Sequence, residues 1–238
     1  MASKTLIDLR GVSRSYQQGG ATVRALADVD LQIDAGEFVA LVGPSGSGKT
    51  SLLNLMGALD TPDAGQVLIG DDDLGRLKRA QRAALRLHKL GFVFQHYSLI
   101  PVLSALENVE YVLVLQGVGA AERRRRATEA LEAVGLSALL HRRPDQLSGG
   151  QQQRVAVARA IVGKPLLVLA DEPTANLDSE TGAWLLALMR GLHDRTGTTF
   201  VFATHDPAVV KQAHRVVRLK DGKVMEDTQH AVPETRRA

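Results

Sequence analysis

A glycine-rich segment, Gly43-Pro44-Ser45-Gly46-Ser47-Gly48-Lys49-Thr50, has the residue types and spacing of a phosphate-binding loop. It matches the pattern G-x-x-x-x-G-K-S/T, in which glycines let successive backbone N–H groups turn inward. A helix that follows directs the positive end of its dipole to the same place. Lys49 supplies a mobile charge for the outer phosphates of a nucleotide, and the Thr50 hydroxyl is suited to ligate magnesium. A flexible linker is the alternative for these eight residues taken alone.

The residues on either side of the loop favour the phosphate-binding interpretation. Residues 38–42 form an unbroken apolar run, which is typical of a buried strand, and residues 51–56 have helical spacing. The loop is therefore expected to be the turn of a strand-loop-helix unit, which is the setting that a phosphate site needs.

Polar residues follow three other predicted strands. Gln95 ends one strand, Asp171 and Glu172 end a second, and His205 ends a third. Open α/β sheets bind ligands at the carboxyl ends of their strands, so we expect these side chains to surround a γ-phosphate. Asp171 would hold magnesium through water, Glu172 would polarise the attacking water, His205 would orient that water, and Gln95 would reach the metal or the water. Taken singly, His205 is more often a loop histidine, and an Asp-Glu pair is more often a helix cap.

Composition limits the remaining function classes. The 238 residues are enough for one large α/β domain with an inserted subdomain, and one nucleotide site is expected. The absence of cysteine excludes disulfides, thiolate zinc sites and thiol catalysis. Aromatic residues make up only 4%, which argues against a base-stacking surface, so no nucleic-acid partner is expected. No apolar run is long enough for a signal peptide or a membrane span, which predicts a soluble protein linked to a membrane only by a partner.

Two parts of the chain have distinct secondary-structure patterns. Residues 5–42 predict an antiparallel sheet, and the stretch between Gln95 and Leu147 predicts an all-helical insertion, where Ser104 and Glu107 have the spacing of a capping box. A hairpin is expected with its turn at Asp221-Gly222. The strands predicted in the N-terminal part are 6–9, 22–26, 29–33 and 38–42.

Three charged segments could each bind a ligand or simply form solvent-exposed surface. Asp71-Asp72-Asp73 suggests a metal site, but consecutive carboxylates alternate in direction, so a solvated loop is favoured. The basic segment 77–90 is typical of a surface helix, with an anionic lipid or nucleic-acid surface as the alternative. The arginines at 123–126 lie among glutamates, which favours a solvated helix face.

The segment Leu147-Ser148-Gly149-Gly150-Gln151, with the helical run 152–160 after it, resembles the signature motif of ATP-binding cassette (ABC) ATPases. The resemblance covers about residues 5 to 226. It implies an α/β fold: a P-loop NTPase (RecA-like) core with an N-terminal antiparallel β subdomain and an inserted α-helical subdomain. The implied organisation is a single ABC ATPase domain over 1–238, with the ATP-binding core and β subdomain at 1–95 and 160–226, the helical subdomain with the signature at 96–159, and a disordered tail at 227–238.

The same resemblance implies a role for each motif residue, with ATP and Mg²⁺ as ligands. Gln95, Glu172 and His205 are the expected catalytic residues, and Thr50, Gln95 and Asp171 the expected metal ligands. Tyr16 is expected to stack on adenine, and Asp178 to lie in the D-loop. The full set expected to contact nucleotide is Tyr16, Gly43, Pro44, Ser45, Gly46, Ser47, Gly48, Lys49, Thr50, Ser51, Ser148, Gly149, Gly150, Gln151 and Asp178.

The signature predicts a second anion site, built by Ser148 and by the N–H groups of Gly149 and Gly150 at a helix N-terminus. The helical insertion is expected to carry this site away from the chain's own phosphate loop. We therefore expect two copies of the chain to face head-to-tail, each completing the other's site.

Finer features resemble the bacterial group of lipoprotein-releasing and macrolide-export ATPases; they lie at residues 54–62, 91–95 and 170–182. The permeases of that group are FtsX-like. The resemblance implies a peripheral subunit at the cytoplasmic face of the bacterial inner membrane, contacting a permease through its helical subdomain, with a periplasmic adaptor or lipoprotein carrier as a further partner. Lipoprotein-releasing members more often have Glu where this chain has Gln151. The alternative is a regulatory ATPase of the cell-division type, which transports nothing and controls periplasmic hydrolases.

Overall fold

The computed structural model describes residues 4–229, and the chain forms two compact units. The first unit holds the chain up to Arg76 and again from Thr199, and the second holds Leu77–Thr198. This is a division by compactness. The functional boundaries expected at 95/96 and 159/160 remain a prediction.

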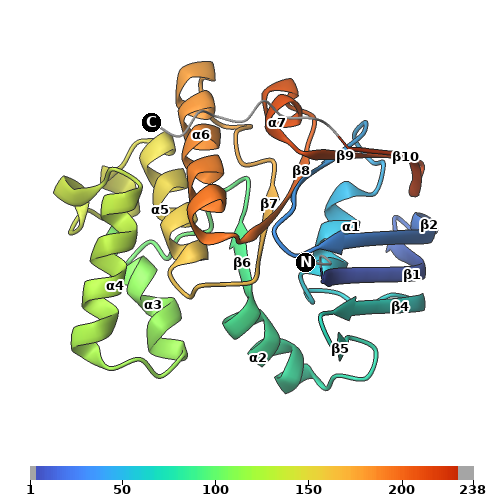
Figure 1. The fold of residues 1–238 in the computed structure, drawn as a ribbon, viewed down its shortest axis with the longest axis horizontal. Helices are drawn as coiled ribbons and strands as arrows, with labels where there is room; N and C mark the ends of the chain where they lie inside the picture. The colour runs from blue at the N-terminus through green and yellow to red at the C-terminus, as the bar shows by residue number, and fades with distance from the viewer. Residues whose placement is uncertain (1–3, 230–238) are drawn as a thin grey trace. The chain divides into compact units, whose positions relative to one another are not determined.

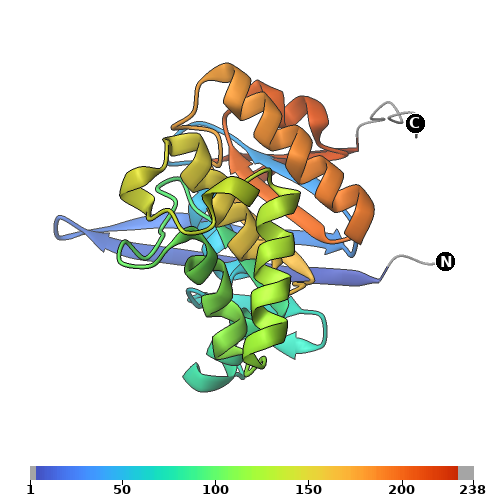
Figure 2. The same ribbon diagram turned by 90° about the vertical axis from the view of Figure 1, so that its left-hand side faces the viewer.

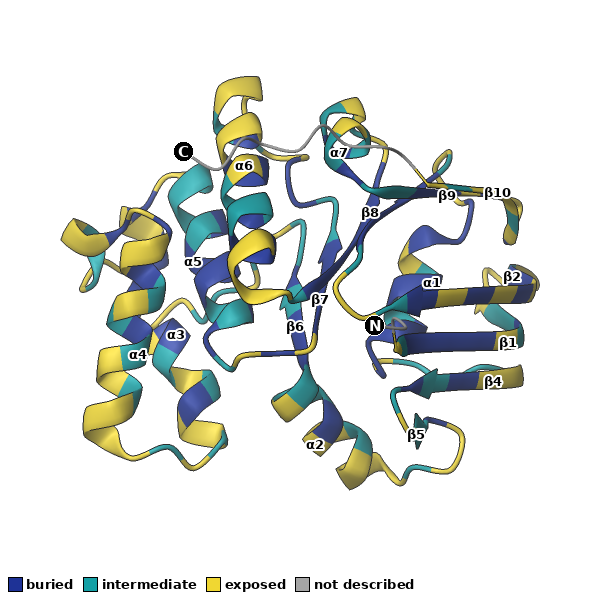
Figure 3. Ribbon diagram, in the orientation of Figure 1, coloured by how far each residue is buried: buried dark blue, intermediate teal, exposed yellow. Residues whose placement is uncertain are grey.

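An antiparallel sheet makes up much of the first unit (Figure 1). Strand β1 (Thr5–Gln18) pairs with β2 (Ala21–Asp34) on one edge and with β4 (Ala64–Ile69) on the other, and β5 (Asp72–Asp73) extends the sheet beyond β4. Buried and exposed residues alternate in β2 from Ala27 to Ile33 (Figure 3), because only one face of this sheet packs on the core.

Two expectations for this sheet are corrected. The separate strands predicted at 22–26 and 29–33 are one continuous strand, because β2 continues through Asp28, which has a positive φ of 54°. Register shifts in its pairing with β1 absorb the irregularity. The segment Asp71–Asp73, predicted as a solvated loop, contains the two-residue strand β5.

The second sheet of this unit has the strand order β10-β9-β3-β8. Every residue of β3 and β8 is buried, as expected for central parallel strands, and β3 is parallel to both β8 and β9. The hairpin predicted around Asp221-Gly222 is confirmed. The elements of this sheet and its helices are β3 (Phe38–Val42), β8 (Thr199–Thr204), β9 (Arg215–Lys220), β10 (Lys223–Gln229), α1 (Lys49–Met56) and α7 (Pro207–Gln212).

The C-terminal end of the described chain differs from the expected disordered tail. Strand β10 continues to Gln229, and Asp227 within it pairs with Arg215 at 2.7 Å. Residues 227–229 are therefore part of a strand. Residues 230–238, the rest of the predicted tail, lie outside the described residues.

The second unit combines a pair of parallel strands with helices. Strand β6 (Leu90–Val93) pairs with β7 (Leu167–Asp171), and helices α3, α4 and α5 pack on one another (Figure 2). The all-helical insertion is confirmed, including the capping box in which Ser104 N–H donates to Glu107 at 2.8 Å. The helices of this unit are α2 (Arg79–Lys89), α3 (Ala105–Leu115), α4 (Ala120–Ala133), α5 (Gly149–Ile161) and α6 (Ser179–Thr196), with short 3₁₀ turns at Ser137–Leu139 and Pro144–Gln146.

The arginine run of α4 has the solvated character that its sequence indicated. Arg125 pairs with Glu122 and with Glu129, both at 2.6 Å, and all three side chains are largely exposed. Within residues 4–229, no helix has both the length and the apolar character needed to cross a membrane.

Candidate functional site

The predicted phosphate loop connects β3 to α1 in the first unit. Lys49 is buried, and its Nζ donates to the carbonyl oxygens of Gly43 at 2.8 Å and Pro44 at 3.1 Å. The Ser47 hydroxyl is also buried and has no hydrogen-bond partner among residues 4–229. Gly48 is the N-cap of helix α1 and offers no side chain to cap the first-turn N–H groups. A buried hydroxyl without a partner beside an uncapped helix N-terminus fits the binding of a phosphate group, which is a strong hydrogen-bond acceptor.

Close packing and backbone conformation explain three glycines of this loop. A Cβ on Gly43 would lie 2.2 Å from the carbonyl oxygen of Leu219, and one on Gly48 would lie 2.6 Å from that of Ala25. Gly46 has a φ of +78°, and a Cβ there would meet nothing within 4 Å. The loop is therefore closed against the strands at Gly43 and Gly48 and open at Gly46, which leaves an approach for a ligand.

His205 directly follows β8 in the same unit. Because β3 and β8 are parallel, with Val42 opposite Thr204, the structure brings His205 and the start of the phosphate loop to one edge of the sheet. The backbone around His205 is fixed on its C-terminal side. Asp206 N–H donates to the Thr204 hydroxyl at 3.0 Å, and the Asp206 carboxylate caps α7 by accepting from Ala208 N–H at 2.8 Å.

Tyr16, the predicted adenine-stacking residue, lies on β1 in a charged cluster. Its hydroxyl donates to Asp60 at 2.9 Å, and the guanidinium carbon of Arg14 lies 5.0 Å from the ring centroid. Arg14 also bonds Asp60 at 2.8 Å and Asp63 at 2.5 Å. The Ser15 N–H and the Arg14 guanidinium hold the pKa of Asp63 below its usual value. Sequence reasoning missed Arg14 and Asp60, because only the fold brings the turn after α1 beside β1.

In the second unit, residues predicted to be catalytic or to bind metal also lie together at the ends of parallel strands. Strands β6 and β7 are parallel with Val93 opposite Ala170, so Gln95, which follows β6, lies at the same edge of this strand pair as Asp171, the last residue of β7, and Glu172. Glu172 has a positive φ of 44°. A non-glycine residue in this region costs about 1–3 kcal/mol and is found preferentially at functional sites, where the backbone is bent to aim a side chain.

The signature segment forms the start of α5. Ser148 is the N-cap: its hydroxyl accepts from Gln151 N–H at 3.3 Å, while Gln151 Oε1 accepts from Ser148 N–H at 2.9 Å. Among residues 4–229 no acceptor is bonded to the Ser148 O–H, so this proton is available to an anion. A Cβ on Gly150 would lie 2.5 Å from Thr181 Cγ2, which shows how closely the start of α5 approaches α6.

The D-loop residues precede α6. Asp178 caps this helix by accepting from Thr181 N–H at 2.9 Å, and that bond lowers the pKa of the carboxyl group. Two residues earlier, Asn176 donates from Nδ2 to the carbonyl oxygen of Gln95 at 2.8 Å. The structure therefore links the D-loop directly to the backbone of a predicted catalytic residue, a contact that the sequence did not indicate.

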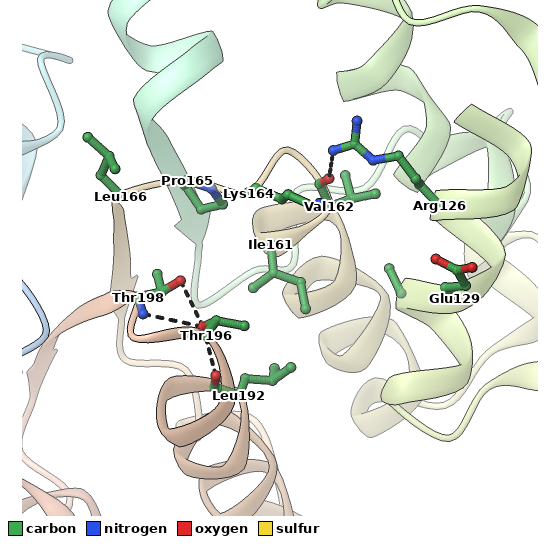
Figure 4. A pocket seen from close by; sticks show the side chains of 11 residues that line it. Arg126, Glu129, Ile161, Val162, Lys164, Pro165, Leu166, Leu192, Thr196 and Thr198 are labelled. Atoms are coloured by element: carbon green, nitrogen blue, oxygen red, sulfur yellow. Dashed lines mark hydrogen bonds between the residues drawn. The ribbon is translucent and has the colours of Figure 1, made fainter. Parts of the chain in front are cut away.

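A pocket of about 490 Å³ lies elsewhere in the second unit, between the second half of α4 and the C-terminal ends of α5 and α6 (Figure 4). Its walls are mainly apolar, and none of the sequence-predicted site residues lines it. At its edge Arg126 donates to the carbonyl oxygen of Val162 at 2.6 Å. The residues predicted for the site therefore lie in loops at strand ends and helix starts, and not in the walls of this pocket.

Comparison with known proteins identifies the family. The profile of the ABC transporter family matches residues 26–175. The chain belongs to the ABC transporter family. It is an ATP-binding cassette with the ATPase activity of that family, which confirms the α/β P-loop NTPase fold class and ATP as the nucleotide. The solved dimeric structure of MJ0796, a bacterial ABC transporter cassette, is 44% identical with a TM-score of 0.88, covering 94% of this chain and 98% of that one.

Curated relatives include members of the predicted group. An uncharacterized ABC transporter ATP-binding protein of Thermotoga maritima is 48% identical over 93% of this chain and 94% of its own length. The lipoprotein-releasing system ATP-binding protein LolD of Shewanella sp. (strain MR-4) is 45% identical over 95% of this chain and 98% of its own length. The macrolide export ATP-binding/permease protein MacB of Sodalis glossinidius is 49% identical over 94% of this chain, which spans only 34% of that protein.

Proposed function

We propose that this ABC ATPase is the nucleotide-binding subunit of a bacterial transporter in which an FtsX-like permease exports cargo or releases lipoproteins at the inner membrane. The observation that carries the nucleotide part is the loop around Ser47 and Lys49, where a buried hydroxyl lacks a partner among the described residues and an ammonium group bonds its own loop. The similarity to LolD and to the ATP-binding part of MacB supports the transporter part. Such a subunit would lie on the cytoplasmic face of the membrane, held there by its permease.

The residues of the phosphate loop have the first role in this proposal. Lys49 Nζ exchanges two neutral carbonyl acceptors for charged phosphate oxygens, which form stronger hydrogen bonds. The Ser47 hydroxyl and the uncapped N–H groups of α1 donate to the same phosphates. Tyr16, fixed by Asp60 and Arg14, offers its ring to the adenine.

The strand-end residues have the second role. Thr50, Gln95 and Asp171 would hold Mg²⁺, which when bound neutralises charge on the phosphate oxygens. Glu172, with its left-handed backbone, polarises the attacking water as general base, and His205 orients that water. No side chain forms a covalent bond in this scheme, because phosphoryl transfer is catalysed by positioning and by stabilisation of charge.

We propose that the complete ATPase is a head-to-tail dimer of this chain. Within the part of the chain that the structure describes, no acceptor is bonded to the O–H of Ser148 at the N-terminus of α5, so it can donate to a phosphate held by a second copy. Shifting a pair of subunits from 1:99 to 99:1 closed requires a difference of about 5.5 kcal/mol between the two states, which γ-phosphate contacts from both copies would provide. The solved MJ0796 cassette is itself described as dimeric.

Purification of the tagged chain from solubilised membranes tests the proposal. We expect an integral membrane protein with FtsX-like topology to co-purify and the complex to hydrolyse ATP. Glu172→Gln should keep the complex but abolish turnover and trap an ATP-bound dimer, whereas Glu180→Gln, at an exposed position in the first turn of α6, should leave turnover unchanged. Rapid hydrolysis by the Glu172→Gln complex would refute the role of Glu172, and recovery of the chain without a membrane protein would refute the permease partner.

The regulatory alternative is not favoured, because the relatives of the predicted group are macrolide export and lipoprotein-releasing proteins. The same purification distinguishes it. A complex that hydrolyses ATP and moves no cargo in a reconstituted membrane, but activates a periplasmic hydrolase, would replace the transport function with regulation.

A further inference from the structure

The segment that follows Gln95 has an unusual backbone. Tyr97 and Ser98 are consecutive residues with positive φ, at 55° and 49°, although neither is glycine. Each costs about 1–3 kcal/mol in this region and persists only when surrounding contacts hold it. The conformation of the Gln95 loop is therefore imposed by other parts of the second unit.

Arg159, on α5, makes the contacts that hold this backbone. Its guanidinium donates to the carbonyl oxygen of Ser98 at 2.5 Å and to that of Tyr97 at 2.9 Å. One side chain thus bonds both residues that have positive φ. The fork of the guanidinium fixes two acceptors at once, which a single-point donor such as lysine cannot do.

The electrostatics of Arg159 point to a role in conformation rather than in general stability. The residue is half-buried, and desolvation lowers its pKa. Among residues 4–229 it has no carboxylate partner, and its hydrogen bonds go to the two carbonyl groups. Partial burial of a cation without an opposite charge is unfavourable, so its benefit lies in the geometry that the two bonds impose.

Two further contacts hold the same loop. A Cβ on Gly149 would lie 2.7 Å from the Tyr97 hydroxyl oxygen, so Tyr97 reaches the first turn of α5, where the signature begins. On the other side, Asn176 bonds the carbonyl oxygen of Gln95. The Gln95 loop is therefore bonded to α5 through Arg159, packs against the first residue of α5 through Tyr97, and is bonded to the segment before α6 through Asn176.

We infer that Arg159 is a positioning residue that fixes Gln95 and couples the Gln95 loop to the signature helix α5. This inference rests on the proposed function, which gives Gln95 its role at the ATP site. A displacement of the Gln95 loop would be transmitted to α5, because Arg159 bonds Tyr97 and Ser98, the second and third residues after Gln95. Loss of Arg159 should lower kcat and leave KM for ATP nearly unchanged, since residues 43–50 hold the phosphates.

A double-mutant cycle between Arg159 and Gln95 tests the inference. We expect Arg159→Ala to lower kcat by about 10- to 100-fold, as misplacement of a positioned group does, with KM within about twofold. Arg159→Lys should recover part of this loss because one donor remains. In a Gln95→Ala background, Arg159→Ala should cause no further loss, because the group that it positions is already absent. If Arg159→Ala does not fold, the cycle is run with Arg159→Lys.

Arg126→Ala is the matched control. It also removes an arginine bond to a backbone carbonyl in the second unit, that of Val162 (Figure 4), and its effect should simply multiply with that of Gln95→Ala. Multiplying effects of Arg159→Ala and Gln95→Ala would overturn the positioning role while leaving the proposed function intact. An unchanged kcat in Gln95→Ala would overturn the role of Gln95 and this inference with it.

Discussion

Two helix N-termini in this molecule are both predicted to bind phosphate, yet they are built in opposite ways. Gly48, the N-cap of α1, has no capping side chain, and it lies between the buried Lys49 and Ser47, whose hydroxyl has no partner among residues 4–229. Helix α5 begins at Ser148, which forms a complete capping box with Gln151. The N–H groups at the start of α1 are left for a ligand to bond. At the start of α5, the side chains of Ser148 and Gln151 already bond part of the N–H groups.

This difference suggests a division of labour between the two sites. An uncapped N-terminus beside a buried cation can bind phosphate within one chain. The capped N-terminus of α5 offers one remaining O–H and has no lysine in its first turn, so it suits the completion of a site that already holds its nucleotide. The head-to-tail dimer that we propose uses the two helix starts in these ways.

The largest effect should come from Lys49→Ala. This change removes the only cation of the phosphate loop, and we expect at least about a 100-fold loss of hydrolysis, the scale seen when one charge-stabilising donor is removed. Binding of a fluorescent ATP analogue to the separate chain should be lost with it. Lys78→Ala, at an exposed N-cap of α2, is the control and should leave both unchanged. If Lys49→Ala bound nucleotide as tightly as the wild type, the start of α1 would not depend on its buried cation. The proposed difference between the N-termini of α1 and α5 would then be wrong.

Ser148→Ala tests whether the N-terminus of α5 completes a nucleotide site rather than binding nucleotide by itself. We expect nucleotide binding to persist, while ATP-driven dimerisation and turnover fall by about tenfold, as for loss of a hydrogen bond worth about 1.5 kcal/mol. In mixed dimers, the defect should appear at the phosphate loop of the other subunit. Ser104→Ala removes an equivalent cap from α3, at a similar stability cost of about 1 kcal/mol, and should leave turnover unchanged. A defect confined to the mutated subunit's own loop would contradict the head-to-tail arrangement.

The smallest effect concerns the pH dependence of the capping boxes. Backbone and hydroxyl bonds from Ser104 hold the pKa of Glu107 below its usual value, whereas the corresponding residue of α5, Gln151, does not titrate. Because the folded-state pKa is depressed, this stabilisation is complete above the unfolded value and is lost as pH falls through the folded value. We expect Glu107→Gln to lower stability by less than about 0.5 kcal/mol at pH 7 and to lose less on acidification, measured by urea unfolding. Equal acid sensitivity of variant and wild type would show that the cap of α3 does not depend on this charge.

Much of the fold and the family followed from the sequence, because it depends on local signals. The phosphate loop, the signature and the buried strands 38–42 and 167–171 are contiguous segments whose glycine spacing and apolar runs can be read directly. The capping boxes at Ser104 and Ser148 are equally local, since N-cap and N3 residues lie three positions apart. The predictions that were wrong concerned the lengths of strands. Strand β2 continues through Asp28, and β10 continues to Gln229.

The contacts that position the site residues were decided only by the tertiary structure. Arg14 with Asp60 around Tyr16, Asn176 on the Gln95 carbonyl, and Arg159 on the backbone of Tyr97 and Ser98 join residues far apart in the chain. The acceptors are often backbone carbonyls, which every residue carries, so residue type gives no sign of which carbonyl a side chain will reach. The sequence by itself determined the motifs and the family, whereas the packing of distant segments decided how Tyr16 and Gln95 are held.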